Sequence, residues 1–461
     1  MYKKNAWLQY DDAEAEQLEA FALRYRNFLN AGKTERECVA EGVRQAEAKG
    51  FRDLNALVAA GERLQPGDRV YANWMGKSLM LFIIGTAPIS EGMNILGAHI
   101  DSPRIDVKQN PLYEDADIAF LDTHYYGGIK KYQWAATPLA LHGKVFLKDG
   151  SCVTVSIGEK PEEPIVYISD LLIHLSADLM SKPAAKVVEG EDLDLIVGSV
   201  PLKDTEKEPV KAACLKLLKE HLGIEEEDLL SAELEAVPAG PCREVGFDRS
   251  LIAGYGHDDR VCAFPSMAAL LDYEGTPKAT LCAILTDKEE IGSVGATGMS
   301  AHYFENTMAE LVALCDRESE LVLRRCLRNS RMLSSDVSAG FDPHYAGMFE
   351  KKNAALMGHG VCFNKFTGRG GKSGSNDCNA EFIAQLRTIM DESGVDFQTA
   401  ELGKVDVGGG GTIAYLCASY GMQVIDCGIP VLSMHAPWEL ISKADLWEEY
   451  KCYRAFVSKA R

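Results

Sequence analysis

Several features that would direct the interpretation elsewhere are missing from this sequence of 461 residues. Its 13 cysteines include no C-x-x-C pair, so the spacing of zinc ribbons and of thioredoxin-like redox sites does not occur. The longest apolar run, Leu79–Gly85, is far shorter than the ~20 residues that a membrane-spanning helix needs. The first residues turn acidic before any apolar core begins, so we predict no secretion signal and expect a cytoplasmic protein with reduced thiols.

Basic residues are also scarce relative to acidic ones. Lys and Arg number 48 against 68 Asp and Glu, which gives a net charge of −20. Such a surface repels phosphate backbones and anionic lipids, so we expect neither nucleic acid nor membrane as a partner. The content of hydrophobic residues, 46%, and of charged residues, 25%, is typical of a packed globular protein, and the length favours two or three domains.

Short, continuous apolar runs near both ends of the chain predict a sheet that is covered on both faces. They are Ser78–Gly85, Met93–His99, Ala279–Thr286 and Gln423–Cys427. Helical periodicity lies between them and includes one long helix expected over Met308–Leu327. This alternation is typical of the α/β class.

The middle of the chain has a different pattern of predicted secondary structure. Short β-type runs such as Lys144–Lys148 and Cys152–Ile157 occur there, together with a polar, acid-rich stretch that holds one amphipathic helix. The economical interpretation is one α/β domain, formed by residues 1–104 and 246–461, with a β-rich domain of residues 105–245 inserted between its halves.

Metal-ligating residue types follow the predicted strands or begin a predicted helix. They are His99 and Asp101, Asp258, Glu289 and Glu290, Asp336, and His435. In open α/β sheets, ligands bind beyond the carboxyl ends of the strands, so we expect these distant residues to converge. Imidazoles combined with carboxylates suit zinc or manganese, and one Asp could bridge two ions at ~3.5–4 Å.

Two short motifs suggest different chemical roles for the residues of this set. In His99-x-Asp101 the histidine would be a ligand, while the aspartate would accept its other ring N–H. The adjacent Glu289 and Glu290 diverge, so one can bind metal and the other can act as a base. A lone His or Asp at a strand end is more often a cap or a surface group, but the five segments together favour a metal site.

At these segments the sequence resembles the aspartyl aminopeptidase family of dinuclear zinc metallo-aminopeptidases, in the tetrahedral-aminopeptidase clan. The stretches that carry the resemblance are Gly97–Arg104 (GAHIDSPR), Asp258–Arg260 (DDR), Asp287–Ser293 (DKEEIGS), Ser334–Val337 (SSDV) and Ser433–His435 (SMH). They span residues 97–435, so the resemblance covers nearly the whole chain.

The resemblance implies a hydrolase that removes the N-terminal residue of peptides with two divalent metal ions per subunit, zinc in the first place, with manganese or cobalt compatible with the same ligands. It implies these roles: Asp258 bridges the ions, His99 and Asp336 hold one, Glu290 and His435 hold the other, Glu289 is the general base, and Asp101 is the partner of His99. It also implies a metallo-exopeptidase α/β/α catalytic domain with an inserted dimerisation domain, and dimers that build a hollow tetrahedral dodecamer.

The sequence defines the substrate-binding residues less narrowly than the metal ligands. By the resemblance, Lys365 would contact an acidic first residue of the substrate, and Lys372 is a second candidate for that contact. The plain alternative for each lysine is a solvated loop charge. Ala339 and Asp342 replace two histidines of the better-known family pattern, and the added negative charge would weaken an acidic preference. His174 would reach a neighbouring subunit's active site, or else be a half-buried helix histidine.

Two alternative functions and two interpretations of a glycine run stay open. A related two-metal carboxypeptidase or amide deacylase would share the ligands but would bind a carboxylate rather than an amine of its substrate. A metal-binding scaffold without catalysis would keep the ligands, although Glu289 argues against it. The run Gly408–Gly411 could bind an anion or carbonyl through its N–H groups, or could be a turn that needs close backbone approach.

Overall fold

The structure, a computed structural model, describes residues 4–316 and 320–460. The chain divides into two compact units. Unit 1 comprises Met1–Asp101, Cys242–Met434 and Glu439–Arg461, and unit 2 comprises Ser102–Pro241 and His435–Trp438. The domain boundaries and roles inferred from the sequence stay predictions.

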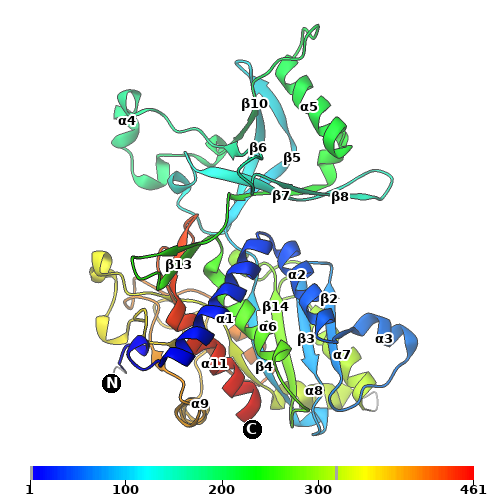
Figure 1. Cartoon of the computed structure of the whole chain (residues 1–461), viewed down its shortest axis with the longest axis vertical. Coiled ribbons are helices and arrows are strands. Elements are labelled where there is room, and N and C mark those ends of the chain that lie inside the picture. Colours follow the sequence, from blue (N-terminus) through cyan, green and yellow to red (C-terminus); the bar gives the residue numbers. More distant parts are fainter. Residues whose placement is uncertain (1–3, 317–319, 461) are drawn as a thin grey trace. The chain divides into compact units, whose positions relative to one another are not determined.

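Unit 1 is built on a nine-stranded sheet (Figure 1). In spatial order its strands are β1 (Arg52–Asp53), β2 (Arg69–Trp74), β3 (Ser78–Ile83), β14 (Thr280–Thr286), β4 (Met93–His99), β15 (Arg331–Ser334), β19 (Gln423–Gly428), β17 (Val361–Asn364) and β18 (Phe397–Thr399). Strands β14, β4, β15 and β19 are mutually parallel, and β3 and β17 flank them antiparallel. The carboxyl ends of the four parallel strands therefore meet at one edge.

Helices cover both faces of this sheet. One core contains α1 (Asp12–Ala31), α2 (Glu35–Ala48), α6 (His257–Leu271), α9 (Ala380–Ser393) and α11 (Lys443–Lys459); the other contains α3 (Leu54–Ala60), α7 (Tyr303–Cys315), α8 (Glu320–Asn329) and α10 (Ala414–Ala418). Alternate residues of β3 enter opposite cores, Leu79 and Leu81 on one face and Met80 and Phe82 on the other. Because each face is buried, the strand is a continuous apolar run, and the predicted α/β class is confirmed.

The prediction of one long helix over Met308–Leu327 is wrong. Helix α7 ends at Cys315, where Asp316 adopts an extended backbone, and α8 begins at Glu320. Both helices place apolar side chains in the same core. The apolar pattern therefore resembles that of one helix, although the helical backbone conformation ends at Cys315.

Two small sheets complete unit 1. The first joins β12 (Arg243–Val245), β13 (Leu251–Gly254) and β21 (Glu439–Ser442), and the second joins β16 (Ser338–Ala339) and β20 (Pro430–Val431). Strand β13 leads through Tyr255 and Gly256 directly into α6, so the first of these sheets fixes where that helix starts.

Unit 2 contains a seven-stranded antiparallel sheet. Its strands are β11 (Ala232–Pro238), β5 (Arg104–Asp115), β6 (Ile118–Tyr126), β10 (Leu195–Gly198), β9 (Val166–Tyr167), β7 (Pro138–Phe146) and β8 (Cys152–Ile157). A further pairing between β11 and β7 closes six of them into a ring. Helices α4 (Ala177–Met180) and α5 (Pro209–Leu222) belong to this unit (Figure 1). Within residues 4–316 and 320–460, no helix combines the length and apolar character needed to cross a membrane.

Candidate metal centre at the sheet edge

Three parallel strands of unit 1 deliver ligand-type side chains to the same edge. His99 is the last residue of β4 and is paired with Thr286, the last residue of β14. Asp336 follows β15, whose Ser334 is paired with Gly97 of β4. The edge on which the sequence-predicted residues should meet is therefore the one formed by the carboxyl ends of these strands.

His99 is buried among carboxylates. Its Nε2 lies 3.1 Å from Asp258 Oδ1, and its Nδ1 lies 3.0 Å from the carbonyl oxygen of Asp101 and 3.3 Å from Asp101 Oδ1. Burial lowers the pKa of this imidazole, but the hydrogen bonds to Asp101 and Asp258, together with the charges of Glu289 and Asp101, raise the pKa well above its ordinary value. With Nδ1 donating to Asp101, Nε2 is the nitrogen that can bind a cation.

Asp101 also fixes the backbone of the Glu289-Glu290 segment. Its Oδ1 accepts a hydrogen bond from the N–H of Glu289 at 3.1 Å, and its Oδ2 accepts one from Glu290 at 3.2 Å. These glutamates begin a single 3-10 turn, Glu289–Ile291, which Asp287 and Lys288 connect to the end of β14. One fully buried carboxylate thus orients the histidine and holds the turn that carries both glutamates.

Asp258 and Asp259 lie at the start of α6 in non-helical backbone conformations. Burial raises the pKa of Asp259 well above its ordinary value, and the nearby Asp258 raises it further. The N–H of Asp258 donates a hydrogen bond of 2.9 Å to Glu439 Oε2. Neither Asp259 nor Glu439 was among the sequence-predicted site residues, although both stand within or close to the matching motifs.

His99, Asp258 and Asp336 each offer a ligand atom, and these atoms lie within 4.8 Å of one another. Burial raises the pKa of Asp336 well above its ordinary value, and Glu289 and Asp259 raise it further. Several carboxylates this close together repel unless a cation or protons compensate them. One imidazole nitrogen with carboxylate oxygens is a donor set that zinc accepts, so the residues present fit the metal.

His435 belongs to the short segment His435–Trp438, which groups with unit 2. Within that unit its Nδ1 lies 2.9 Å from the carbonyl oxygen of Gly128. The segment lies between Met434 and Glu439 of unit 1. On either side of it, the backbones of Leu432 and Leu440 exchange two hydrogen bonds of 3.0 Å.

The candidate substrate residues lie in different surroundings. Lys365 is exposed. The ammonium of Lys372 is 3.1 Å from Asp377 Oδ2 and 4.0 Å from the centre of the Phe366 ring, so its charge already has a partner. His174 lies in an exposed 3-10 turn, Ile173–Leu175, and the alternative of a half-buried helix histidine is therefore wrong.

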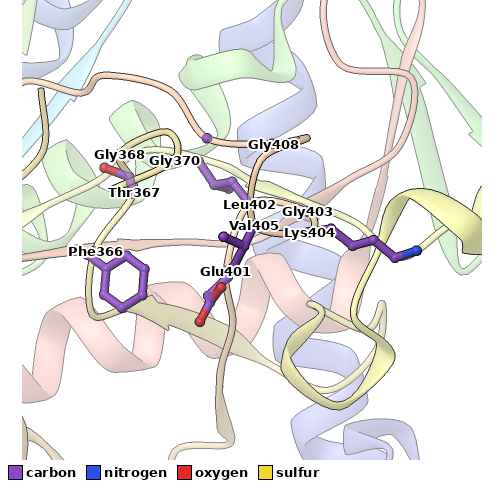
Figure 2. Close-up of a pocket in the computed structure, with 11 residues that line it drawn as sticks. Phe366, Thr367, Gly368, Gly370, Glu401, Leu402, Gly403, Lys404, Val405 and Gly408 are labelled. Atoms are coloured by element: carbon purple, nitrogen blue, oxygen red, sulfur yellow. The ribbon is translucent and has the colours of Figure 1, made fainter. Parts of the chain in front are cut away.

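The glycine run Gly408–Gly411 contributes to a small pocket (Figure 2). The pocket, also lined by Phe366 and Glu401, has a volume of about 30 Å³, which suits about one water molecule. A Cβ on Gly408 would lie 1.7 Å from the carbonyl oxygen of Leu402, and Gly409 has a φ of +111°. Close backbone approach explains these two glycines, as the second interpretation of the run expected.

Comparison with known proteins matches residues 28–457 to the family model of aminopeptidase I zinc metalloproteases, M18. A probable M18 family aminopeptidase 1 from Clostridium acetobutylicum is 56% identical over 99% of this chain and 98% of that protein. The crystal structure of an M18 aminopeptidase from Thermotoga maritima has a TM-score of 0.94 at 44% identity and covers 100% of both chains.

The mApe1 dodecamer of S. cerevisiae, at 19% identity, a TM-score of 0.75 and coverage of 95% and 96%, shares the fold. The closer relatives are aminopeptidases and share almost the full length, so the carboxypeptidase and deacylase alternatives find no support among them. The resemblance seen in the sequence is confirmed: this chain belongs to the M18 family of zinc metalloproteases and is an aminopeptidase.

Proposed function

We propose that this aminopeptidase works with two zinc ions at the edge of the unit 1 sheet. His99 and Asp336 would hold one ion, Asp258 would lie between the two, and Glu290 and His435 would complete the second. The observation that carries the proposal is the convergence of His99, Asp258 and Asp336 from three separate segments of the chain. Manganese and cobalt suit the same ligands, so the ligand set defines a divalent transition metal but does not by itself select zinc.

Bound there, the metals would polarise the scissile carbonyl and make water a nucleophile at neutral pH. Glu289 would take the proton from the attacking water and pass it to the leaving amine. Its carboxylate lies 3.9 Å from His99 Nε2 and is 15% exposed, so it stands beside the ligands and remains accessible to water. Asp101 would keep Nε2 of His99 free for metal and would hold Glu289 through its backbone.

A preference for acidic N-terminal residues would depend on Lys365 more than on Lys372. Lys365 is exposed, whereas Lys372 is paired with Asp377. Asp342 adds a negative charge where the better-known family pattern has a histidine, and this would weaken the preference. Reporter peptides with Asp, Glu, Leu or Ala at the N-terminus would rank the preference directly.

Self-association is the second part of the proposal: dimers that build a tetrahedral dodecamer in the cytoplasm. Unit 2 exposes a run of apolar side chains around His174, namely Leu171, Leu172, Ile173 and Leu175, and the last two are 66% and 69% exposed. An exposed apolar patch of this kind is typical of a protein interface. Reduced thiols suit the cytoplasm, and the 13 cysteines of the structure are all free.

Metal analysis combined with turnover tests the catalytic part. The protein is chelated, dialysed and reloaded with zinc, and bound metal and turnover of an aminoacyl reporter are followed together. We expect about two zinc ions per subunit, loss of turnover on chelation and recovery on reloading. Stoichiometric zinc without turnover of any reporter would favour the silent scaffold instead.

A further inference from the structure

Glu439 has no role in the metal set above, yet its carboxylate contacts the backbone of the residue proposed to lie between the two ions. Its Oε2 accepts the hydrogen bond from the N–H of Asp258 at 2.9 Å. Glu439 is only 2% exposed, and Asp258 is 3% exposed. Water competes little for a hydrogen bond at a buried position, so this contact restrains the backbone of Asp258.

The position of Glu439 is set by strand pairing. Glu439 opens β21 and is paired with Gly254 at the end of β13, four residues before Asp258. The strand is closely packed at that point, because a Cβ on Gly254 would lie 2.8 Å from Cys242 Cβ and 3.0 Å from Leu29 Cδ2. The ladder therefore fixes the backbone from which the carboxylate reaches the start of α6.

The backbone of Asp258 needs such a partner. The first N–H groups of a helix have no acceptor within the helix, and Asp258, with φ −77° and ψ 106°, departs from helical geometry. The hydrogen bond to Glu439 thus acts where the helix itself supplies no restraint. Glu439 also stands one residue before Leu440, which closes the loop that carries His435.

We propose that Glu439 is a positioning residue of the metal centre: by accepting the hydrogen bond from Asp258 it holds that residue's backbone, and hence its carboxylate, in the orientation that binds metal. The same residue ties the start of α6 to the base of the loop that carries His435. The inference rests on the proposed function, and it depends on an acceptor atom at the correct reach, not on the negative charge of Glu439.

Two substitutions separate reach from charge. Glu439→Gln keeps an acceptor oxygen at the same distance but removes the charge, whereas Glu439→Asp keeps the charge but shortens the side chain. Zinc affinity is measured by metal content after dialysis against buffered free zinc, and the coordination geometry by the visible absorption of the cobalt-substituted protein. We expect Glu439→Gln to stay within about threefold of the unsubstituted protein, and Glu439→Asp to lose about 10- to 100-fold.

Glu448 offers a matched control. It is a fully buried glutamate of the same unit whose Oε2 accepts a hydrogen bond from the N–H of Asp396 at 2.8 Å, and it belongs to no ligand segment. Glu448→Gln and Glu448→Asp should leave zinc affinity unchanged, even where they lower the melting temperature. Should Glu439→Asp fail to fold, Glu439→Met, which is similar in length without the acceptor, takes its place.

The inference is overturned if folded Glu439→Asp binds zinc as tightly as the unsubstituted protein, or if Glu439→Gln loses as much affinity as Glu439→Asp. Failure of the proposed function has a different signature: the unsubstituted protein itself would bind no stoichiometric zinc. Circular dichroism and melting of each metal-free variant show that the compared proteins are folded.

Discussion

The two units differ in what they bury and what they expose. Unit 1 buries carboxylates at and behind one edge of its sheet, among them Asp101, Asp259 and Asp287, each fully buried. Unit 2 has a run of apolar side chains that are exposed together, Leu171, Leu172, Ile173 and Leu175, and the last two are 66% and 69% exposed. Burying acids is costly unless a cation or hydrogen bonds compensate them, and exposing apolar side chains is costly unless a partner covers them. The comparison supports the two proposals made above, a metal site at the sheet edge of unit 1 and a protein interface on unit 2.

The sharpest test of unit 1 is Glu289→Gln. The amide cannot take a proton from water, so turnover should fall by about 10²- to 10⁴-fold, while zinc content stays that of the unsubstituted protein. Steady-state kinetics and metal analysis on the same sample measure both. A variant that keeps near-normal turnover would remove Glu289 from the role of general base.

The second prediction compares a leucine buried in unit 1 with one exposed in unit 2. Leu81 of β3 is fully buried, whereas Leu217 of α5 is 52% exposed. Leu81→Ala should lower the free energy of unfolding by about 2–5 kcal/mol, because it leaves a cavity, and Leu217→Ala should change it by about 0.5 kcal/mol or less. Denaturant unfolding of both variants tests the difference, and equal effects would contradict the assignment of the sheet as the main core.

A third prediction concerns buried acid that lies outside the metal ligands. Asp426 of β19 accepts a hydrogen bond from Thr412 Oγ1 at 2.6 Å, yet burial raises its pKa to about 7. The folded chain therefore holds this proton more tightly than the unfolded chain does. Stability falls as the pH rises from the ordinary carboxyl pKa of about 4 to about 7, and it is constant with respect to this group above that range.

Asp426→Asn lacks that titration. Between pH 5 and pH 8, the free energy of unfolding of the unsubstituted protein should fall relative to that of the variant by about 2–3 kcal/mol. Urea unfolding at several pH values measures the difference, with the exposed Asp117→Asn as a control. A difference that does not change with pH would show that Asp426 titrates alike in both states.

The smallest change in subunit stability is expected on the exposed patch of unit 2. Replacing both Ile173 and Leu175 by serine should alter the free energy of unfolding of a subunit by about 0.5 kcal/mol or less, because the side chains are exposed. Light scattering after size-exclusion chromatography should nonetheless show a smaller assembly. Leu217→Ser is the control, and an unchanged mass for the double variant would place the interface elsewhere.

The sequence predicted the sheet edge well because its strands are buried on both faces. The run Met93–His99 coincides with β4. Ligand-type residues that directly follow parallel strands lie at the edge formed by the carboxyl ends of those strands. In unit 2, β5 and β6 were not predicted as strands. Their register shifts between Val107 and Leu112 interrupt the simple alternation that marks a half-buried strand.

Side-chain roles divided in the same way. Nothing in the local pattern at Glu439 indicates that it holds the N–H of Asp258, since that contact depends on the pairing of β21 with β13. Likewise, the sequence did not show that the ammonium of Lys372 pairs with the carboxylate of Asp377. That pairing reduces the attraction of Lys372 for an acidic substrate.

By itself, the sequence determined the class of fold, the family and the residue types able to hold a divalent metal, because strand burial and ligand chemistry depend on local pattern. Tertiary structure alone decided which of those residues meet, and that the carboxylate of Glu439 accepts a hydrogen bond from the N–H of Asp258. These outcomes depend on contacts between segments up to hundreds of residues apart, and such contacts leave no periodic trace in the chain.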